Sequence, residues 1–254
     1  MVTNGTILAV AFIGGILPTL VWLWFFLKED GRRPEPWWLI FVVFLAGMAS
    51  VMVAYPLEKG VEMLSRALGW AESATWYAVL APIVLFSFSE EITKFAAARF
   101  TALRSIFYDE PIDAMIYLIT AALGFAAMEN FLYLFFNLLQ STPFEEALLN
   151  AQLRFLGATL LHVVTSASIG TALAFAYYLC PHRKRSYLAI GILTAVLLHT
   201  LFNFLIMKAQ GNSAEIFRVF EYFWLLAIVI IFLFETVKRI KKKPYVEEKS
   251  WHIF

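Results

Sequence analysis

The sequence predicts an all-α, polytopic membrane bundle of about seven transmembrane helices. The 254 residues are 61% hydrophobic and only 15% charged, whereas a soluble domain carries roughly a quarter charged residues. That excess of apolar surface is unsuited to water, so we expect it to face lipid. The apolar residues also fall into stretches long enough for bilayer-spanning helices, which need about 20 residues each.

Seven apolar stretches satisfy that length. They cover residues 5–27, 37–55, 74–100, 112–139, 154–180, 186–207 and 217–237. The first has a long uncharged core and no basic residue before it, so we expect an uncleaved span rather than a signal peptide. The chain therefore reads as one integral membrane domain over residues 1–254, ending in a basic cytoplasmic tail at 238–254.

Two polar connectors are predicted to form short interfacial helices. In residues 56–70, apolar side chains recur at helical spacing and form one stripe. In residues 141–155, Thr142 and Glu145 match a capping box, with Pro143 at the first helical position.

The basic residues predict the orientation of the bundle. The loops after spans one, three and five, together with the C-terminal tail, hold fourteen Lys and Arg, against five on the other side. The positive-inside rule then places the N-terminus outside and the C-terminus in the cytoplasm. The run "KRIKKK" directly follows an apolar helix, which indicates anchoring at an anionic membrane surface and not nucleic-acid binding. With the single cysteine Cys180, the fold does not depend on an internal disulfide.

Ionisable side chains are confined to spans three to six. Spans one and two have none in their interiors, whereas the four central spans contain Glu90, Glu91, Lys94, Glu129, His162 and His199. A charge in mid-bilayer costs about 3 kcal/mol or more, so such residues normally face the bundle interior and serve function. This segregation predicts a buried polar site.

The depth of these residues supports one common site. At 1.5 Å per residue, Glu90 lies roughly 24 Å from the outer end of its span and Glu129 roughly 15 Å. His162 and His199 each lie roughly 12 Å below the outer surface. The four side chains therefore share a band from mid-membrane to the outer leaflet.

Helical spacing suggests partners within that band. Glu90 and Lys94 are four residues apart and face one another, so Lys94 can neutralise Glu90, whereas Glu91 points about a quarter-turn away. His199 and Asn203 also share one helix face. Asn130 is expected to orient a backbone group or a carboxylate.

Four motifs in these spans resemble the PrsW family of intramembrane proteases. They are "EEITK" from Glu90, "GFAAMENFLY" from Gly124, "LHVVTSASIG" from Leu161 and "HTLFN" from His199, one per span and in the family's order. Asp113 also resembles a family position. The related type II CAAX prenyl proteases carry EExxxR and FxxxH, whereas this chain has EExxK and ends its FxxxE motif in Glu129, which favours PrsW.

The resemblance implies a membrane-embedded endopeptidase with its catalytic core at about 74–207. Some members of the family perform site-1 cleavage of an anti-sigma factor, so the expected partner is a single-span membrane protein in the lipid bilayer of the cell membrane. The expected catalytic residues are Glu90, Glu91, Glu129, His162, His199 and Asn203, with Lys94, Asn130 and Asp113 in support.

Peptide hydrolysis needs an activated water and a donor to the oxyanion, and the residues allow two ways to supply them. In one, Glu129, His162 and His199 hold Zn²⁺, and Glu90 or Glu91 takes the proton from water. In the other there is no metal, a buried glutamate activates water, and His199 and Asn203 donate to the oxyanion.

Two other function classes use a similar cluster. A non-catalytic scaffold would keep the histidines as contacts between helices, but it has little need of two adjacent glutamates. An ion or proton transporter also lines a cavity with Glu and His, but such proteins often contain inverted repeats and broken helices, which this sequence does not show.

Overall fold

The computed structural model describes residues 4–29, 33–73, 75–140 and 142–241, and this part of the chain contains helices and turns but no strand. In chain order, the elements are α1 (Asn4–Glu29), α2 (Trp37–Ala67), the short 3-10 turn η1 (Trp70–Glu72), α3 (Trp76–Thr101), α4 (Asp113–Leu139), α5 (Phe144–Arg154), the π-helical turn η2 (Phe155–Thr159), α6 (Leu160–Phe175), α7 (Pro181–Ala209) and α8 (Ser213–Val237). The predicted tail lies outside the described residues from position 242 onward.

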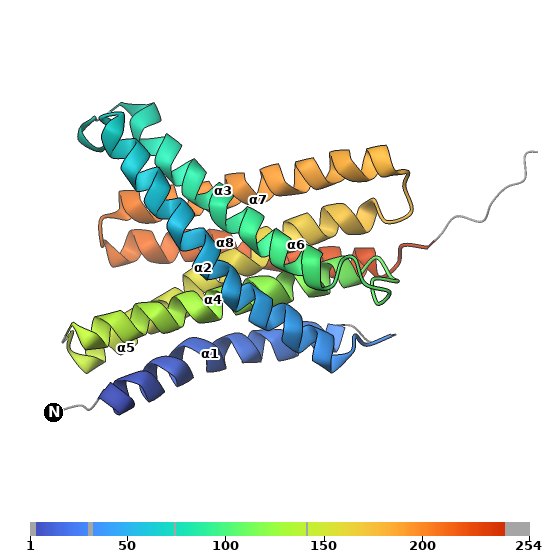
Figure 1. Ribbon diagram of the computed structural model, residues 1–254, viewed down its shortest axis with the longest axis horizontal. Helices are drawn as coiled ribbons and strands as arrows, with labels where there is room; N and C mark the ends of the chain where they lie inside the picture. Colours follow the sequence, from blue (N-terminus) through green and yellow to red (C-terminus); the bar gives the residue numbers. More distant parts are fainter. Residues whose placement is uncertain (1–3, 30–32, 74, 141, 242–254) are drawn as a thin grey trace, which may run out of the picture.

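Successive long helices run in opposite directions along the bundle. In Figure 1, α1, α3 and α8 run the same way as the path formed by α5, η2 and α6, while α2, α4 and α7 run back. The chain thus passes along the bundle seven times within the described residues, as seven apolar segments joined by short loops require.

Six helical stretches of the described chain are long and apolar enough to cross a membrane. The remaining long helix, α3, has 26 residues, or about 39 Å at 1.5 Å per residue. It has the length of a span, but four charged residues, Glu90, Glu91, Lys94 and Arg99, lower its hydropathy. The predicted all-α polytopic bundle is confirmed. The long helix that falls below the hydropathy of a typical span is the one that carries the two adjacent glutamates.

The two connectors are helical, as predicted, but each continues directly into a neighbouring long helix and does not stand apart as a short helix. Residues 56–67 continue α2 through Pro56, which lies inside the helix. Residues 144–154 form α5, which passes through η2 into α6, so the helical path extends from Phe144 to Phe175. Neither junction contains a strong helix stop, and one proline removes a single hydrogen bond and need only kink the helix.

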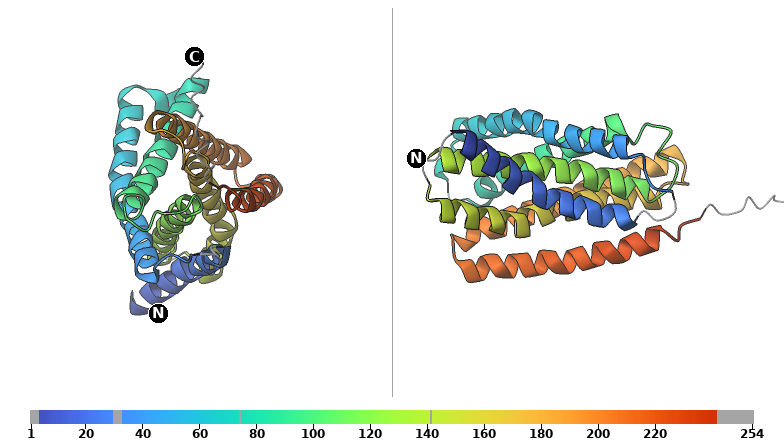
Figure 2. Two further views of the ribbon diagram at one scale, coloured as in Figure 1. Left: turned by 90° about the vertical axis from the view of Figure 1, so that its right-hand side faces the viewer. Right: turned by 90° about the horizontal axis from the view of Figure 1, so that it is seen from below.

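Helix α4 lies at the centre of the bundle. Every residue from Asp113 to Ala127 is buried, and α4 packs against α1, α2 and α6, as the end-on view in Figure 2 shows. A Cβ atom on Gly124 would overlap the carbonyl oxygen of Phe44 in α2. Small residues of this kind let membrane helices approach closely, and here they fix α2 against α4.

The orientation of the bundle is open to a direct test. Glu145 and Glu146 begin α5 at the end of the bundle opposite to the end of α8 (Figure 1). The excess of basic residues around the other end predicts that this α5 end faces outward. Cysteines placed at either glutamate should be labelled from outside, and a tag after Phe254 should be reached only from the cytoplasm. The exposed Cys180 must first be replaced by serine, and labelling of both positions from one side would contradict the orientation.

Candidate active site

Four helices bring the predicted residues together inside the bundle. Glu90 and Glu91 lie on α3, Glu129 on α4, His162 on α6 and His199 on α7. Glu90, Glu91 and both histidines are buried, while the side chain of Glu129 is 26% exposed. Residues separated by more than one hundred positions thus form one cluster, as the shared depth of the sequence motifs predicts.

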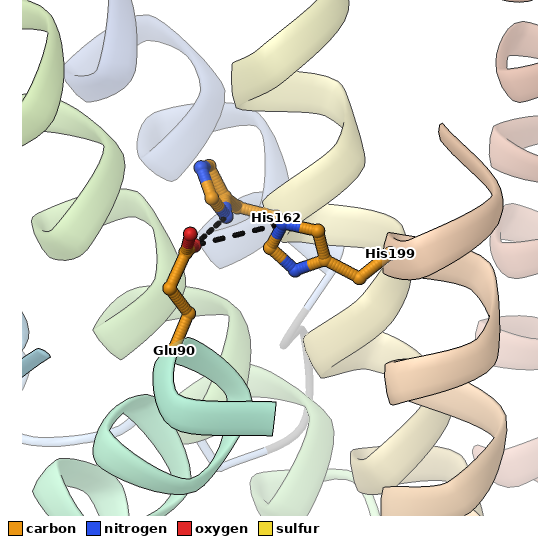
Figure 3. Close-up of side chains that lie close together, drawn as sticks. All are labelled: Glu90, His162 and His199. Atoms are coloured by element: carbon orange, nitrogen blue, oxygen red, sulfur yellow. Dashed lines mark ion pairs between the residues drawn. The ribbon is translucent and has the colours of Figure 1, made fainter. Parts of the chain in front are cut away.

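Glu90, His162 and His199 lie close together within the cluster (Figure 3). Glu90 Oε2 lies 3.8 Å from His162 Nδ1 and 3.6 Å from His199 Nε2. One ligand atom from each residue falls within 4.8 Å of the others. Glu90 Oε2 is buried and has no hydrogen-bond partner in the described part of the chain, so it is available to a cation or a proton at this point.

Glu91 orients His199. Its Oε1 accepts a hydrogen bond of 2.7 Å from His199 Nδ1. Because that nitrogen is the donor, the neutral ring presents the lone pair of Nε2, and Nε2 is the nitrogen that faces Glu90. A carboxylate behind the imidazole is the usual way in which proteins fix the orientation of a metal-binding histidine.

Lys94 and Glu129 hold His162 from both sides. Lys94 Nζ lies 2.9 Å from His162 Nδ1, and Glu129 Oε2 lies 2.8 Å from His162 Nε2. An ammonium group can only donate, so Nδ1 accepts and Nε2 donates to Glu129. The ring of Phe125, which opens the FxxxE motif, packs against the imidazole at 5.3 Å and lies 5.0 Å from Lys94 Nζ.

The closest carboxylate to Lys94 is Glu91, which differs from the predicted pairing with Glu90. Lys94 Nζ is 2.6 Å from Glu91 Oε1 and 4.0 Å from Glu90 Oε2. Both spacings, three and four residues, place side chains on the same helix face. In the structure Glu91 Oε1 takes the closer contact with the ammonium group, while Glu90 stays at the edge of the ion-pair range.

The group that could hold a metal also differs from the predicted one. The expected set was Glu129, His162 and His199, whereas the structure gathers Glu90 with the two histidines. Glu129 binds His162 through Nε2, on the other edge of the imidazole ring. The membrane depth estimated from the sequence could not distinguish Glu90 from Glu129, because both lie in the same band.

A second layer supports Glu129 and includes Arg154, which the sequence reasoning missed. Arg154 Nη2 lies 3.7 Å from Glu129 Oε2, and its Nε donates to Asn130 Oδ1 at 3.3 Å. Asn130 also donates to Thr159 Oγ1 at 3.0 Å. Asn130 therefore positions Arg154 and not a carboxylate. The available signal was that Arg154 is the only Lys, Arg, Asp or Glu between Glu146 and His182.

A cavity of about 340 Å³ opens beside the cluster. Glu90, Glu129, His162 and His199 reach it, and further wall residues come from α5, α7 and α8. Those include Asn150, Arg154, Phe202, Asn203, Ile216 and Phe220. The predicted Asn203 thus lies on the cavity wall one helical turn after His199, whereas Glu91 and Lys94 are behind the lining.

Asp113 lies apart from the cluster. It begins α4, sixteen residues before Glu129, or about 24 Å along the helix. Its Oδ2 accepts hydrogen bonds from the backbone N–H groups of Asp109 and Glu110, at 2.9 and 2.6 Å. These contacts fix the loop before α4, so the support that Asp113 gives is to the fold of that loop.

The fold and this site define a class: a multi-pass membrane protein that buries carboxylates and imidazoles beside a cavity, as hydrolysis inside a membrane requires. A family model described as PrsW family intramembrane metalloprotease matches residues 35–234. The chain belongs to this family, which confirms the resemblance of the four motifs, and it is a peptidase that works in the lipid bilayer on membrane proteins. Membership of this family favours an enzyme over the two alternatives, a non-catalytic scaffold and an ion or proton transporter.

Individual relatives agree with that assignment. The protein named Protease PrsW from Geobacillus kaustophilus is 28% identical over 196 residues, which cover 77% of this chain and 79% of that protein. Its namesake from Clostridioides difficile is 24% identical over 232 residues, covering 87% and 84%. The one from Halalkalibacterium halodurans is 27% identical over 198 residues, covering 76% and 81%. No solved structure matches the chain.

Replacing Lys94 by methionine should destabilise the protein. The change would leave Glu91 buried without its ammonium partner, and breaking a buried ion pair costs about 3–5 kcal/mol. Thermal unfolding in detergent measures the effect, with K59M as the control because Lys59 pairs with Glu62 at the exposed surface. The double variant K94M/E91Q should recover part of the loss, and a K94M protein as stable as the parent would refute the role of Lys94.

Proposed function

We propose that the protein is a zinc-dependent endopeptidase that cuts single-span membrane proteins on the side where α5 lies. The observation that carries the proposal is the buried group of Glu90, His162 and His199, which opens onto the 340 Å³ cavity. The group supplies the donors for a metal, and the cavity offers a substrate segment a place beside them. An anti-sigma factor is the substrate that the family resemblance suggests.

The chemistry of the donor group fits a zinc ion. One carboxylate and two imidazoles form a common ligand set for catalytic zinc, which keeps a fourth position open. Glu90 Oε2 has no hydrogen-bond partner in the described chain, and the lone pair of His199 Nε2 faces it at 3.6 Å. Two facing acceptors repel one another unless a cation or a proton lies between them. When bound, the ion would lower the pKa of a water molecule and polarise the scissile carbonyl.

The remaining residues divide the other tasks. Glu129 reaches the cavity, so it is placed to take a proton from water and pass it to the leaving amine. Glu91 does not reach the cavity, and its contact with His199 makes it a positioning residue. Asn203 and Arg154 line the cavity and carry N–H donors for the oxyanion.

A metal-free reaction is the alternative, and one contact favours it. Lys94 Nζ already occupies His162 Nδ1 at 2.9 Å, the nitrogen that faces Glu90. If that contact persists in the working enzyme, the carboxylate of Glu90 would itself activate water, with His199 at its side. The two versions differ in whether the active protein holds a metal.

Metal analysis of an active preparation decides between them. We expect about one zinc per chain, loss of cleavage on chelation and recovery when zinc is added back. E90Q should lose both zinc and cleavage of a reconstituted single-span substrate, and E91Q should bind zinc about 10–100-fold more weakly because the support of His199 is removed. E62Q, an exposed change on α2, serves as control. Full activity without metal would support the metal-free reaction, in which the carboxylate of Glu90 activates water.

The position of the cavity predicts where the substrate is cut. Its wall comes from α5, the later halves of α4 and α7, and the start of α8, all toward the end of the bundle predicted to face outward (Figure 1). A helical substrate must first unwind to expose an amide, which is easiest near the end of its span. Mass spectrometry of the products should therefore map the cut to the outer membrane boundary or the adjoining stalk. A cut in the cytoplasmic third of the span or in the cytoplasmic tail would refute this reading.

A further inference from the structure

A second cavity lies at the opposite end of the same helices. It has a volume of about 390 Å³, within the range of small-molecule sites, roughly 300–1,000 Å³. The end of α3, the end of α6, the start of α7 and the loop after α3 form its wall. We propose that it binds one anionic phospholipid, with the phosphate held by Arg99, Lys184 and Arg185.

The charges around this cavity favour an anion. Its wall contains three cationic side chains and no acidic one. None of the three forms an ion pair within the described part of the chain; Arg99 lies 6.0 Å from the ring of Phe95, and Lys184 lies 5.5 Å from the ring of Tyr177.

The acidic residues of the neighbouring loop are engaged elsewhere. Asp109 and Glu110 contact Arg33 at 3.4 and 3.5 Å. They therefore leave the three cations of the cavity unneutralised, and a phosphate diester would supply the missing negative charge.

The rest of the wall favours a lipid over a free phosphate ion. It is formed by the side chains of Phe95, Leu103, Tyr108, Leu173 and Leu188. An inorganic ion would gain nothing from this apolar surface, whereas an acyl chain would be stabilised by burying its apolar surface against it. The cavity also lies at the end of long membrane-spanning helices, where headgroups and the first part of the acyl chains are found. Basic pockets between such helices are suited to anionic headgroups.

A lipid bound here would tie together two helices that carry the active site. Arg99 lies nine residues after Glu90 on α3, about 13.5 Å along the helix. Leu188 lies eleven residues before His199 on α7, about 16.5 Å. The lipid would thus clamp the distal ends of α3 and α7 without touching the catalytic group. The proposal does not depend on the reaction mechanism.

Lipid binding by the full chain tests the proposal. Protein purified in a neutral detergent would be titrated with phosphatidylglycerol or phosphatidylcholine, and native mass spectrometry and thermal unfolding would measure bound lipid and stability. We expect one phosphatidylglycerol to be retained in preference to phosphatidylcholine, with a rise in the unfolding temperature. Inorganic phosphate and short-chain glycerophosphoglycerol should give neither effect, and an equal effect of phosphate would overturn the assignment to a lipid.

Matched variants distinguish specific lipid binding in the cavity from nonspecific attraction to a basic surface. R99Q/R185Q removes two cavity cations and should weaken binding on the order of thirtyfold, at about 1 kcal/mol per basic residue. R104Q/R183Q removes the same charge from exposed positions of the same bundle end that do not line the cavity, and it should bind as the parent does. Equal losses in both pairs would refute the site.

A change in the apolar wall completes the test. L173W would fill part of the cavity while keeping all three cations, so it should lower retention of phosphatidylglycerol. If L173W misfolds, L188Q, at a partly exposed wall position, replaces it. If a folded wall variant retained phosphatidylglycerol as well as the parent does, the lipid would be held by charge alone. That result would refute the cavity as the binding site.

Discussion

The buried ammonium group of Lys94 is the interaction on which the rest of the site depends. It is fully enclosed, in a part of the bundle where an unpaired charge would cost several kcal/mol. Its two closest contacts, with Glu91 at 2.6 Å and His162 at 2.9 Å, join α3 to α6. Through Glu91 the same network reaches His199 on α7. One cation thus compensates buried carboxylate charge and fixes three helices in register.

That network also explains how α3 can lie in a membrane bundle at all. By hydropathy it is the least suited of the long central helices, because its charges exceed what an apolar span tolerates. The cost is lowered because α2, α4 and α7 pack around it, and Glu91 and Lys94 have no exposed side-chain surface. The charged face of α3 is therefore turned toward protein and the cavity, while residues such as Phe88 and Phe100 remain exposed on other faces.

The sequence allowed the class of fold and the membership of the cluster to be predicted, because both follow from one-dimensional quantities. Segment length and hydropathy identify spans, and position along a span gives depth. Partners within the cluster depend on three-dimensional detail. Spacing alone could not choose between Glu90 and Glu91 for Lys94, because both spacings place the carboxylate on the same helix face as the ammonium group, and the structure shows the shorter contact with Glu91.

The same limit applies to the second layer and to the helix boundaries. Residue 154 lies where the predicted connector (141–155) and the predicted span (154–180) overlap, and the continuous path from α5 through the π turn η2 into α6 places Arg154 beside Glu129. A helical pattern of apolar residues shows that a segment is helical but does not show whether it joins the next helix. Gly157 lies within η2, where a Cβ would overlap the ring of Phe220 in α8. The turn therefore packs closely against α8, and π turns of this kind are frequent at functional sites.

The burial pattern of α4 shows from which side water can reach the cluster. Its first fifteen residues, Asp113 to Ala127, are all buried by the surrounding helices. From Met128 onward the side chains are mostly half-buried, and Glu129 and Tyr133 line the cavity. Glu129 therefore lies where α4 changes from fully buried to mostly half-buried. The cavity that reaches Glu90 and the histidines is lined by α5, so it offers water an approach to them from that side.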